Sequence, residues 1–141
     1  LSGMILGLHI GTKPEEIYRA LIEGTAFGMR RIFENYAEYG IMVESLGAAG
    51  GIAQKDEMLM QIYADVLNRP IAVSKATQAG ALGSAVYAAV AGGLYPTVTD
   101  AADAMAAKAE RVYTPDPMAV DAYEGLYRRY RELHDRFGGI S

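Results

Sequence analysis

The chain has 141 residues, which suits one domain, because domains usually contain roughly 100 to 200 residues. Apolar residues make up 51% and charged residues 21%, as in a soluble globular protein rather than a disordered one. The formal charge of -4 argues against nucleic acid as a partner, and the absence of Cys excludes disulfides, thiolate metal sites and Cys nucleophiles. No apolar run approaches the roughly 18 residues of a membrane span. We therefore expect a cytoplasmic protein that binds neither nucleic acid nor membrane.

A long helix is predicted over residues 12–39. Thr12 and Glu15 have the spacing of a capping box, in which each side chain bonds the other residue's backbone N-H. Gly24 and Gly28 each cost about 1 kcal/mol of helix propensity relative to Ala, so we expect a neighbouring element to approach closely there. One stripe of side chains recurs with the helical period: Ile17, Leu21, Thr25, Met29, Ile32 and Tyr36.

The segment "IMVESLGAAGG", residues 41–51, has the apolar and β-branched content of a largely buried strand that ends at Gly50 and Gly51. Asp56 is expected to cap the next helix, and Asn68 to end it. The apolar stripe of this second helix comprises Leu59, Ile62, Tyr63 and Val66.

The second half of the chain contains a short strand followed by helices. Residues 69–74, "RPIAVS", predict the strand. A turn and a helix rich in Ala, Gly and Ser follow within residues 76–93, and this composition lets the helix lie close to a sheet. Thr99 is expected to cap a helix over residues 100–109, and "YTPDP", residues 113–117, is a spacer that cannot continue a helix. The last helix carries Val120, Tyr123, Leu126, Tyr127, Tyr130, Leu133 and Phe137 at helical spacing.

This order of elements predicts an α/β fold with two parallel strands joined by helical crossovers. Two strands are fewer than the roughly four to six of most sheets. Either partner strands belong to a missing N-terminal part, or the chain borrows strands from another molecule. The chain begins at Leu1 without an initiator Met, which favours a processed product or a piece of a longer protein.

The pair Gly50 and Gly51 allows two interpretations. Without a Cβ, both residues let a flat base or a ribose approach the backbone at the carboxyl end of a strand. Gln54 and Lys55 follow in the connecting loop and could reach a ribose hydroxyl or a phosphate. Alternatively, the pair only forms a tight turn, since this stretch is neither a G-x-G-x-x-G motif nor a Walker loop. The residues alone leave both interpretations open.

Other candidates for chemistry are weaker. His9 and His134 are isolated, without a second ligand at helical spacing, so no metal site is predicted. The terminal aromatic residues Tyr123, Tyr127 and Tyr130 are expected in the core. No residue supplies a convincing general base, and no catalytic residue is predicted.

Several phrases resemble the C-terminal domain of the FGGY carbohydrate kinases, most closely the ribulokinases within that family. They are "GGIAQK" at 50–55, "LMQIYADVLNRPI" at 59–71, "GALGSAVYAAVAGG" at 80–93 and "YRALIEGTAFGMRRIFE" at 18–34. The resemblance runs from about Gly3 to Tyr130, nearly the whole chain.

In that family, two actin- and hexokinase-type domains with ribonuclease-H-like cores close on ATP and a sugar. The resemblance implies that residues 1–141 form a single partial domain, the helix-rich C-terminal part, which lacks its opening β-hairpin and keeps the last two of five strands. It implies an adenosine-binding motif made of Gly50, Gly51, Ile52, Gln54 and Lys55. It also implies an interdomain motif made of Gly80, Ala81, Leu82 and Gly83, where Gly83 lets the helix pack against its counterpart in the other domain.

The activity implied for the intact enzyme is phosphoryl transfer from Mg-ATP to a primary hydroxyl of a ketopentose, L-ribulose giving L-ribulose 5-phosphate. The sugar pocket and the catalytic aspartate would lie upstream, so the isolated chain is expected to be inactive. Its partners would be an adenine nucleotide and the missing N-terminal sugar-binding domain, with a homodimer as a further option. The alternatives are another FGGY kinase, for xylulose, glycerol or D-ribulose, and a non-enzymatic helical assembly module.

Overall fold

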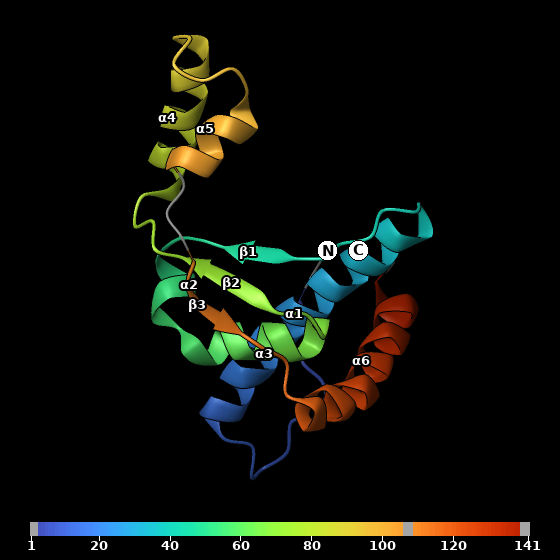
Figure 1. Cartoon of the computed structure of the whole chain (residues 1–141). Helices are drawn as coiled ribbons and strands as arrows, with labels where there is room; N and C mark the ends of the chain where they lie inside the picture. The colour runs from blue at the N-terminus through green and yellow to red at the C-terminus, as the bar shows by residue number, and fades with distance from the viewer. Residues whose placement is uncertain (1–2, 106–108, 139–141) are drawn as a thin grey trace. The chain divides into compact units, whose positions relative to one another are not determined.

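The computed structural model of the chain describes residues 3–105 and 109–138. Its elements, in chain order, are α1 (Pro14–Glu38), β1 (Leu46–Ala48), α2 (Gly51–Lys55), α3 (Glu57–Leu67), β2 (Ile71–Ser74), α4 (Ala79–Ala91), α5 (Val98–Met105), β3 (Ala109–Tyr113) and α6 (Pro117–Phe137) (Figure 1). They form two compact units. The helical unit contains residues 3–44, 61–69 and 114–138, and the sheet unit contains residues 45–60, 70–105 and 109–113.

Helix α1 begins at Pro14, two residues later than predicted, and its N-cap is Lys13 instead of Thr12. Lys13 is extended, with φ -96° and ψ 151°, because a residue before proline is pushed away from the helical region. Pro14 then occupies the first turn, where its missing N-H costs nothing. The Lys13 N-H donates to the Glu16 carboxylate at 2.8 Å. The predicted capping pair of Thr12 and Glu15 is therefore wrong by one position.

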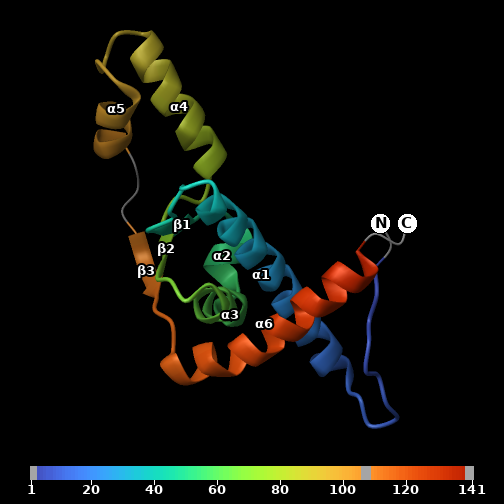
Figure 2. The same ribbon diagram turned by 90° about the vertical axis from the view of Figure 1, so that its right-hand side faces the viewer.

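The core of the helical unit joins α1 to α6 through aromatic rings, and Figure 2 shows the two helices crossing. The Phe27 ring lies 6.0 Å from Tyr123, 5.8 Å from Tyr127 and 5.5 Å from Tyr130, measured between centroids. The expectation of a core position is confirmed for Tyr123 and Tyr127, whereas Tyr130 is half-buried. Helix α3 adds buried aliphatic side chains, among them Val66, to the same unit.

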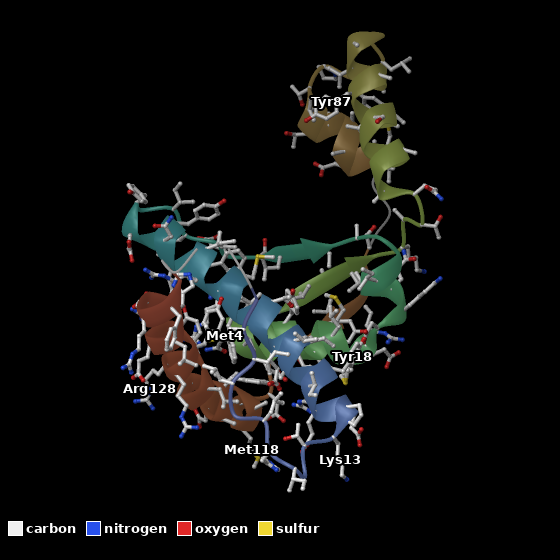
Figure 3. The ribbon with its side chains drawn as sticks, turned by 180° about the vertical axis from the view of Figure 1, so that it is seen from behind. Met4, Lys13, Tyr18, Tyr87, Met118 and Arg128 are labelled. Carbon is white, nitrogen blue, oxygen red and sulfur yellow. The ribbon has the colours of Figure 1, made fainter. Side chains whose placement is uncertain are left out.

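Helix α1 has two apolar faces, and the structure buries the less regular one. Ile22, Ala26 and Phe27 are buried. The stripe with the clearest helical period in the sequence is instead largely exposed, with Leu21 at 56% of its surface. Leu21 lines an apolar groove of about 480 Å³ together with Met4, which lies beside α1 in Figure 3. A periodic stripe thus locates a helix without saying which face the chain itself covers.

The sheet has the order β1-β2-β3 (Figure 1). β1 pairs parallel with β2, with Leu46 opposite Ile71, so the predicted pair of parallel strands is confirmed. The first strand is shorter than residues 41–51, because only Leu46–Ala48 make the ladder. β3 was not predicted and runs antiparallel to β2. Among the described residues it pairs with β2 alone, and its Arg111 and Val112 side chains are exposed, so it lacks the apolar run that marks a buried strand.

Two boundaries in the second half of the chain also differ from prediction. Thr97, rather than Thr99, caps α5, since its Oγ1 accepts from the Asp100 N-H at 3.1 Å. Of the helix predicted over residues 100–109, residues 106–108 lie outside the described part of the chain, and Ala109 begins β3. Helices α4 and α5 pack as a pair within the sheet unit (Figure 1).

Candidate functional site

The turn between β1 and α2 requires glycine at one of its two glycine positions. Gly50 has φ +100° and ψ 172°, a conformation that only glycine adopts without strain. Gly51 is the first residue of α2 and has no such backbone demand. Beyond the adjacent residues and the backbone of its own helix, a Cβ added to Gly51 would meet no described atom within 4 Å. The turn therefore explains Gly50, while the space over Gly51 stays open.

Helix α2 turns a pair of side chains outward. Ile52 and Lys55, three residues apart and therefore on one face of the helix, are both exposed, Ile52 at 69%. Ala53 is buried and anchors the opposite face. The structure thus brings Gly51, Ile52 and Lys55 together on one exposed surface at the carboxyl end of β1.

Gln54 points elsewhere, toward the end of the neighbouring strand. Its Nε2 donates to the backbone oxygens of Ser74 and Ala76, both at 3.1 Å. The contact spans the carboxyl ends of β1 and β2, which lie at the same edge because the strands are parallel. The predicted contact of Gln54 with a base or ribose stays a prediction, and its amide nitrogen already has two backbone partners.

Strand β3 adds residues that the sequence did not indicate. Arg111 and Tyr113 line a small cavity of about 120 Å³ with Ala53, Gln54 and Val73. The Arg111 guanidinium donates to the Tyr113 hydroxyl at 3.1 Å and pairs with the Glu57 carboxylate. The hydrogen bond to Glu57, followed by the one to Tyr113, raises the pKa of Arg111. Arg111 and Tyr113 lie two residues apart, the spacing of one face of a strand, but this pattern spans too few residues to predict a strand.

The four residues of the predicted interdomain motif form the first turns of α4. A Cβ on Gly80 or on Gly83 would meet no atom within 4 Å among the residues considered. Ser84 Oγ donates to the Gly80 backbone oxygen at 3.1 Å, Ala81 is exposed and Leu82 is half-buried. The described residues therefore give no packing reason for either glycine, and the interdomain role stays a prediction.

Within the described residues, His, Asp and Glu side chains form no group of three or more that could hold a metal ion. His9 bonds locally, since its Nδ1 accepts from the Gly11 N-H at 3.0 Å, and His134 lies 3.4 Å from the Asp135 carboxylate. No described helix is long and apolar enough to cross a membrane.

Comparisons with known proteins place these features in a family. The sequence profile of the FGGY family of carbohydrate kinases, C-terminal domain, matches residues 1–92. The chain is 47% identical to a ribulokinase of Geobacillus thermodenitrificans, with 98% of this chain and 25% of that protein covered. It thus spans about a quarter of the length of that curated relative.

Solved structures agree. A xylulose kinase from Rhodospirillum rubrum matches at a TM-score of 0.83 and 28% identity, covering 98% of this chain and 28% of that one. A glycerol kinase from Plasmodium falciparum, solved with ADP, matches at a TM-score of 0.72 and 27% identity, covering 92% of this chain and 26% of that one. The predicted fold class is confirmed, with β3 added to its two strands. The chain belongs to the FGGY family of carbohydrate kinases, and its match is to their C-terminal domain.

Proposed function

We propose that the chain is the adenine-nucleotide-binding part of an ATP-dependent carbohydrate kinase whose sugar is a ketopentose, L-ribulose. The observation that carries the proposal is the exposed surface of Gly51, Ile52 and Lys55 at the carboxyl end of β1, with open space over Gly51. Ligands of open α/β sheets bind at that end of the strands. A glycine that the chain's own packing does not require fits a site that a flat base or a ribose occupies.

The exposed residues of α2 suit such a ligand. Gly50 holds the turn, and Gly51 leaves room for the nucleotide beside the backbone. Ile52 offers an apolar surface for a base, and the Lys55 ammonium offers a positive charge for a ribose oxygen or a phosphate. The bound ATP would supply the phosphoryl group, with Mg²⁺ neutralising its charge. Because the described residues hold no acidic cluster, we expect the ligands of Mg²⁺ to come from the nucleotide and from the rest of the enzyme.

The sugar assignment depends on likeness rather than on this site. The ribulokinase relative is 47% identical, whereas the xylulose and glycerol kinases are 28% and 27% identical. Both remain alternatives, as does D-ribulose. We propose that the sugar pocket and the catalytic base belong to an N-terminal domain within the remaining length of such relatives. The single partial domain described here would then have no kinase activity alone, and the absence of Cys fits a cytoplasmic location.

A matched pair of glycine substitutions tests the nucleotide site. Gly51→Leu places a side chain in the open space and is expected to abolish the binding of ADP, measured by isothermal titration calorimetry. Gly47→Leu is the control, because Gly47 lies in β1 and a Cβ there also meets no atom within 4 Å among the residues considered. We expect Gly47→Leu to bind ADP like the parent chain, with circular dichroism showing that both variants fold.

The second candidate is an assembly module without enzymatic function. The exposed apolar stripe of α1 favours it, since such a surface associates readily. In that case Gly50 and Gly51 serve only as a turn, and Gly51→Leu would leave ADP binding at the parent level. That result would overturn the nucleotide site, and size-exclusion chromatography would then show whether the chain forms a homodimer.

A further inference from the structure

We infer that Gln54 is a positioning residue, which ties helix α2, directly after β1, to the loop after β2 and does not itself contact the nucleotide. This inference rests on the proposed nucleotide site. It assigns to Gln54 a role different from the direct contact that its place in the motif suggests. It also makes the segment that leads into α4 a support of the site.

The hydrogen bonds of Gln54 fix the orientation of its carboxamide. The Nε2 group has two hydrogens, and both partners, the backbone oxygens of Ser74 and Ala76, are acceptors only. A carboxamide turned the other way would point its Oε1 at two carbonyl oxygens, which repel it. The chemistry of the partners therefore determines which end of the amide faces the loop, and both donors are used there.

The loop after β2 is shaped to receive this amide. Ser74 is the last residue of β2, and its Oγ accepts from the Ala76 N-H at 3.1 Å, which curls the loop at this point. The chain then passes to Gln78, whose backbone oxygen accepts from the Leu82 N-H at 3.0 Å in the first turn of α4. Gln54 thus joins the nucleotide turn to the short connection that leads into α4.

Helix α2 needs such a tie because it is short. It has five residues, and Ala53 is its buried residue. Isolated helices of this length are not stable in water, so contacts to the rest of the fold must hold α2 in place. The two bonds from Gln54 supply a fixed point beside Ala53. Without them, the exposed surface of Gly51, Ile52 and Lys55 loses part of its support.

Two substitutions of opposite chemistry separate a positioning role from a direct contact. Gln54→Lys keeps donors for the two carbonyls and removes the acceptor oxygen. Gln54→Glu keeps acceptor oxygens and removes the donors, so that a carboxylate faces two carbonyls. We propose to titrate each variant of the 141-residue chain with adenosine and follow backbone amide shifts by NMR. Adenosine is uncharged, so the charge of the variants does not bias its affinity.

We expect Gln54→Lys to bind adenosine within about twofold of the parent chain, and Gln54→Glu to bind about tenfold more weakly, because it removes the Gln54 donors from two carbonyls and places a carboxylate against them. Gln61→Glu is the matched control. Gln61 Nε2 donates to the Thr114 backbone oxygen at 2.9 Å and to the Asp65 carboxylate at 2.8 Å, within the helical unit. Its substitution should lower the melting temperature while adenosine affinity stays at the parent value.

Equal losses in the two Gln54 variants, or a Gln54→Glu variant that binds more tightly than Gln54→Lys, would overturn the inference and leave the nucleotide site standing. A parent chain that gives no adenosine-dependent shifts near Gly51 would overturn the site and the inference together. The behaviour of the parent chain thus distinguishes the two failures.

Discussion

Different interactions stabilise the helical unit and the sheet unit, each within itself. In the helical unit, large side chains cross between elements. The Arg30 guanidinium stacks 4.2 Å above the Tyr127 ring, bridges Glu124 at 2.6 Å and donates to the Val66 backbone oxygen at 3.3 Å. In the sheet unit, backbone ladders join the strands, and the candidate site lies at the carboxyl end of β1. We infer that changes in the helical unit mainly cost stability, whereas changes in the sheet unit mainly cost binding.

The buried carboxylate of Asp65 is an example of a side chain that links elements of the helical unit. It accepts from Gln61 Nε2 and from the Asp116 backbone N-H, each at 2.8 Å, so it is buried without being unsatisfied. These bonds link α3 to the start of α6, where Asp116 caps the helix by accepting from the Met118 N-H at 2.9 Å. No comparable buried charge was found near Gly51 in the described part of the chain.

The largest effect is expected from Phe27→Ala. It removes the ring around which the α6 tyrosines pack and should lower the free energy of unfolding by about 3 to 5 kcal/mol. Urea denaturation followed by circular dichroism measures this change in the free energy of unfolding. Phe137→Ala is the control, because Phe137 is the last residue of α6 and its side chain is only half-buried. A loss below about 1 kcal/mol would show that the aromatic contacts contribute little to the stability of the helical unit.

An intermediate effect is expected at Gly50, and almost none at its neighbour. Gly50→Ala forces a positive φ on a residue with a Cβ and should cost about 1 to 3 kcal/mol. Gly51→Ala meets open space at a helical position and should change stability by less than about 0.5 kcal/mol. The same denaturation measurement compares the two variants. Equal losses in the free energy of unfolding would contradict the view that the turn requires glycine at position 50 but not at position 51.

Among the substitutions expected to destabilise the chain, Tyr127→Phe should have the smallest effect. The Tyr127 hydroxyl donates to the Glu34 carboxylate at 2.7 Å, and its loss should cost about 1 kcal/mol near neutral pH. Burial, then the bond to Glu34, raises the pKa of Tyr127. Above about pH 10 the unfolded tyrosine ionises while the folded one keeps its proton, so stability is fully present below that pH and falls as pH rises.

The Tyr127→Phe variant should therefore lose less stability than the parent chain between neutral pH and pH 11 or so. Melting temperatures at a series of pH values measure the slope. Tyr123, whose pKa burial also raises, keeps part of the alkaline loss in the variant. Identical slopes in the two proteins would show that Tyr127 does not govern this loss.

The sequence predicted best what neighbouring residues decide. Asp56 caps α3 as expected, since its Oδ1 accepts from the Leu59 N-H at 2.9 Å. Asn68 ends that helix with a positive φ of 49°. The apolar runs predicted the two strands, and the helical segment between these runs predicted that the strands pair in parallel. The family resemblance then suggested the candidate site, whose residues are neighbours in the sequence and which stays a prediction.

Two failures are local, since the caps of α1 and α5 lie one and two residues from their predicted positions. The other failures concern contacts between distant positions. β3 depends on pairing with β2, which lies far earlier in the chain, and its own composition does not indicate a strand. The partners of Gln54 lie 20 and 22 residues away, so its side-chain orientation could not be predicted from its motif. The exposed stripe of α1 repeats regularly, but periodicity does not determine which of two apolar faces the chain covers.

That exposed stripe has a practical consequence for every melting experiment on this chain. A groove of about 480 Å³ lined by Met4, Leu21 and other apolar side chains offers a folded-state site for solvatochromic dyes. Such dyes should fluoresce before heating begins, which masks the signal of unfolding. The chain also has no Trp for intrinsic fluorescence. Far-ultraviolet ellipticity, which the long helices α1 and α6 dominate, is therefore the signal that reports its unfolding.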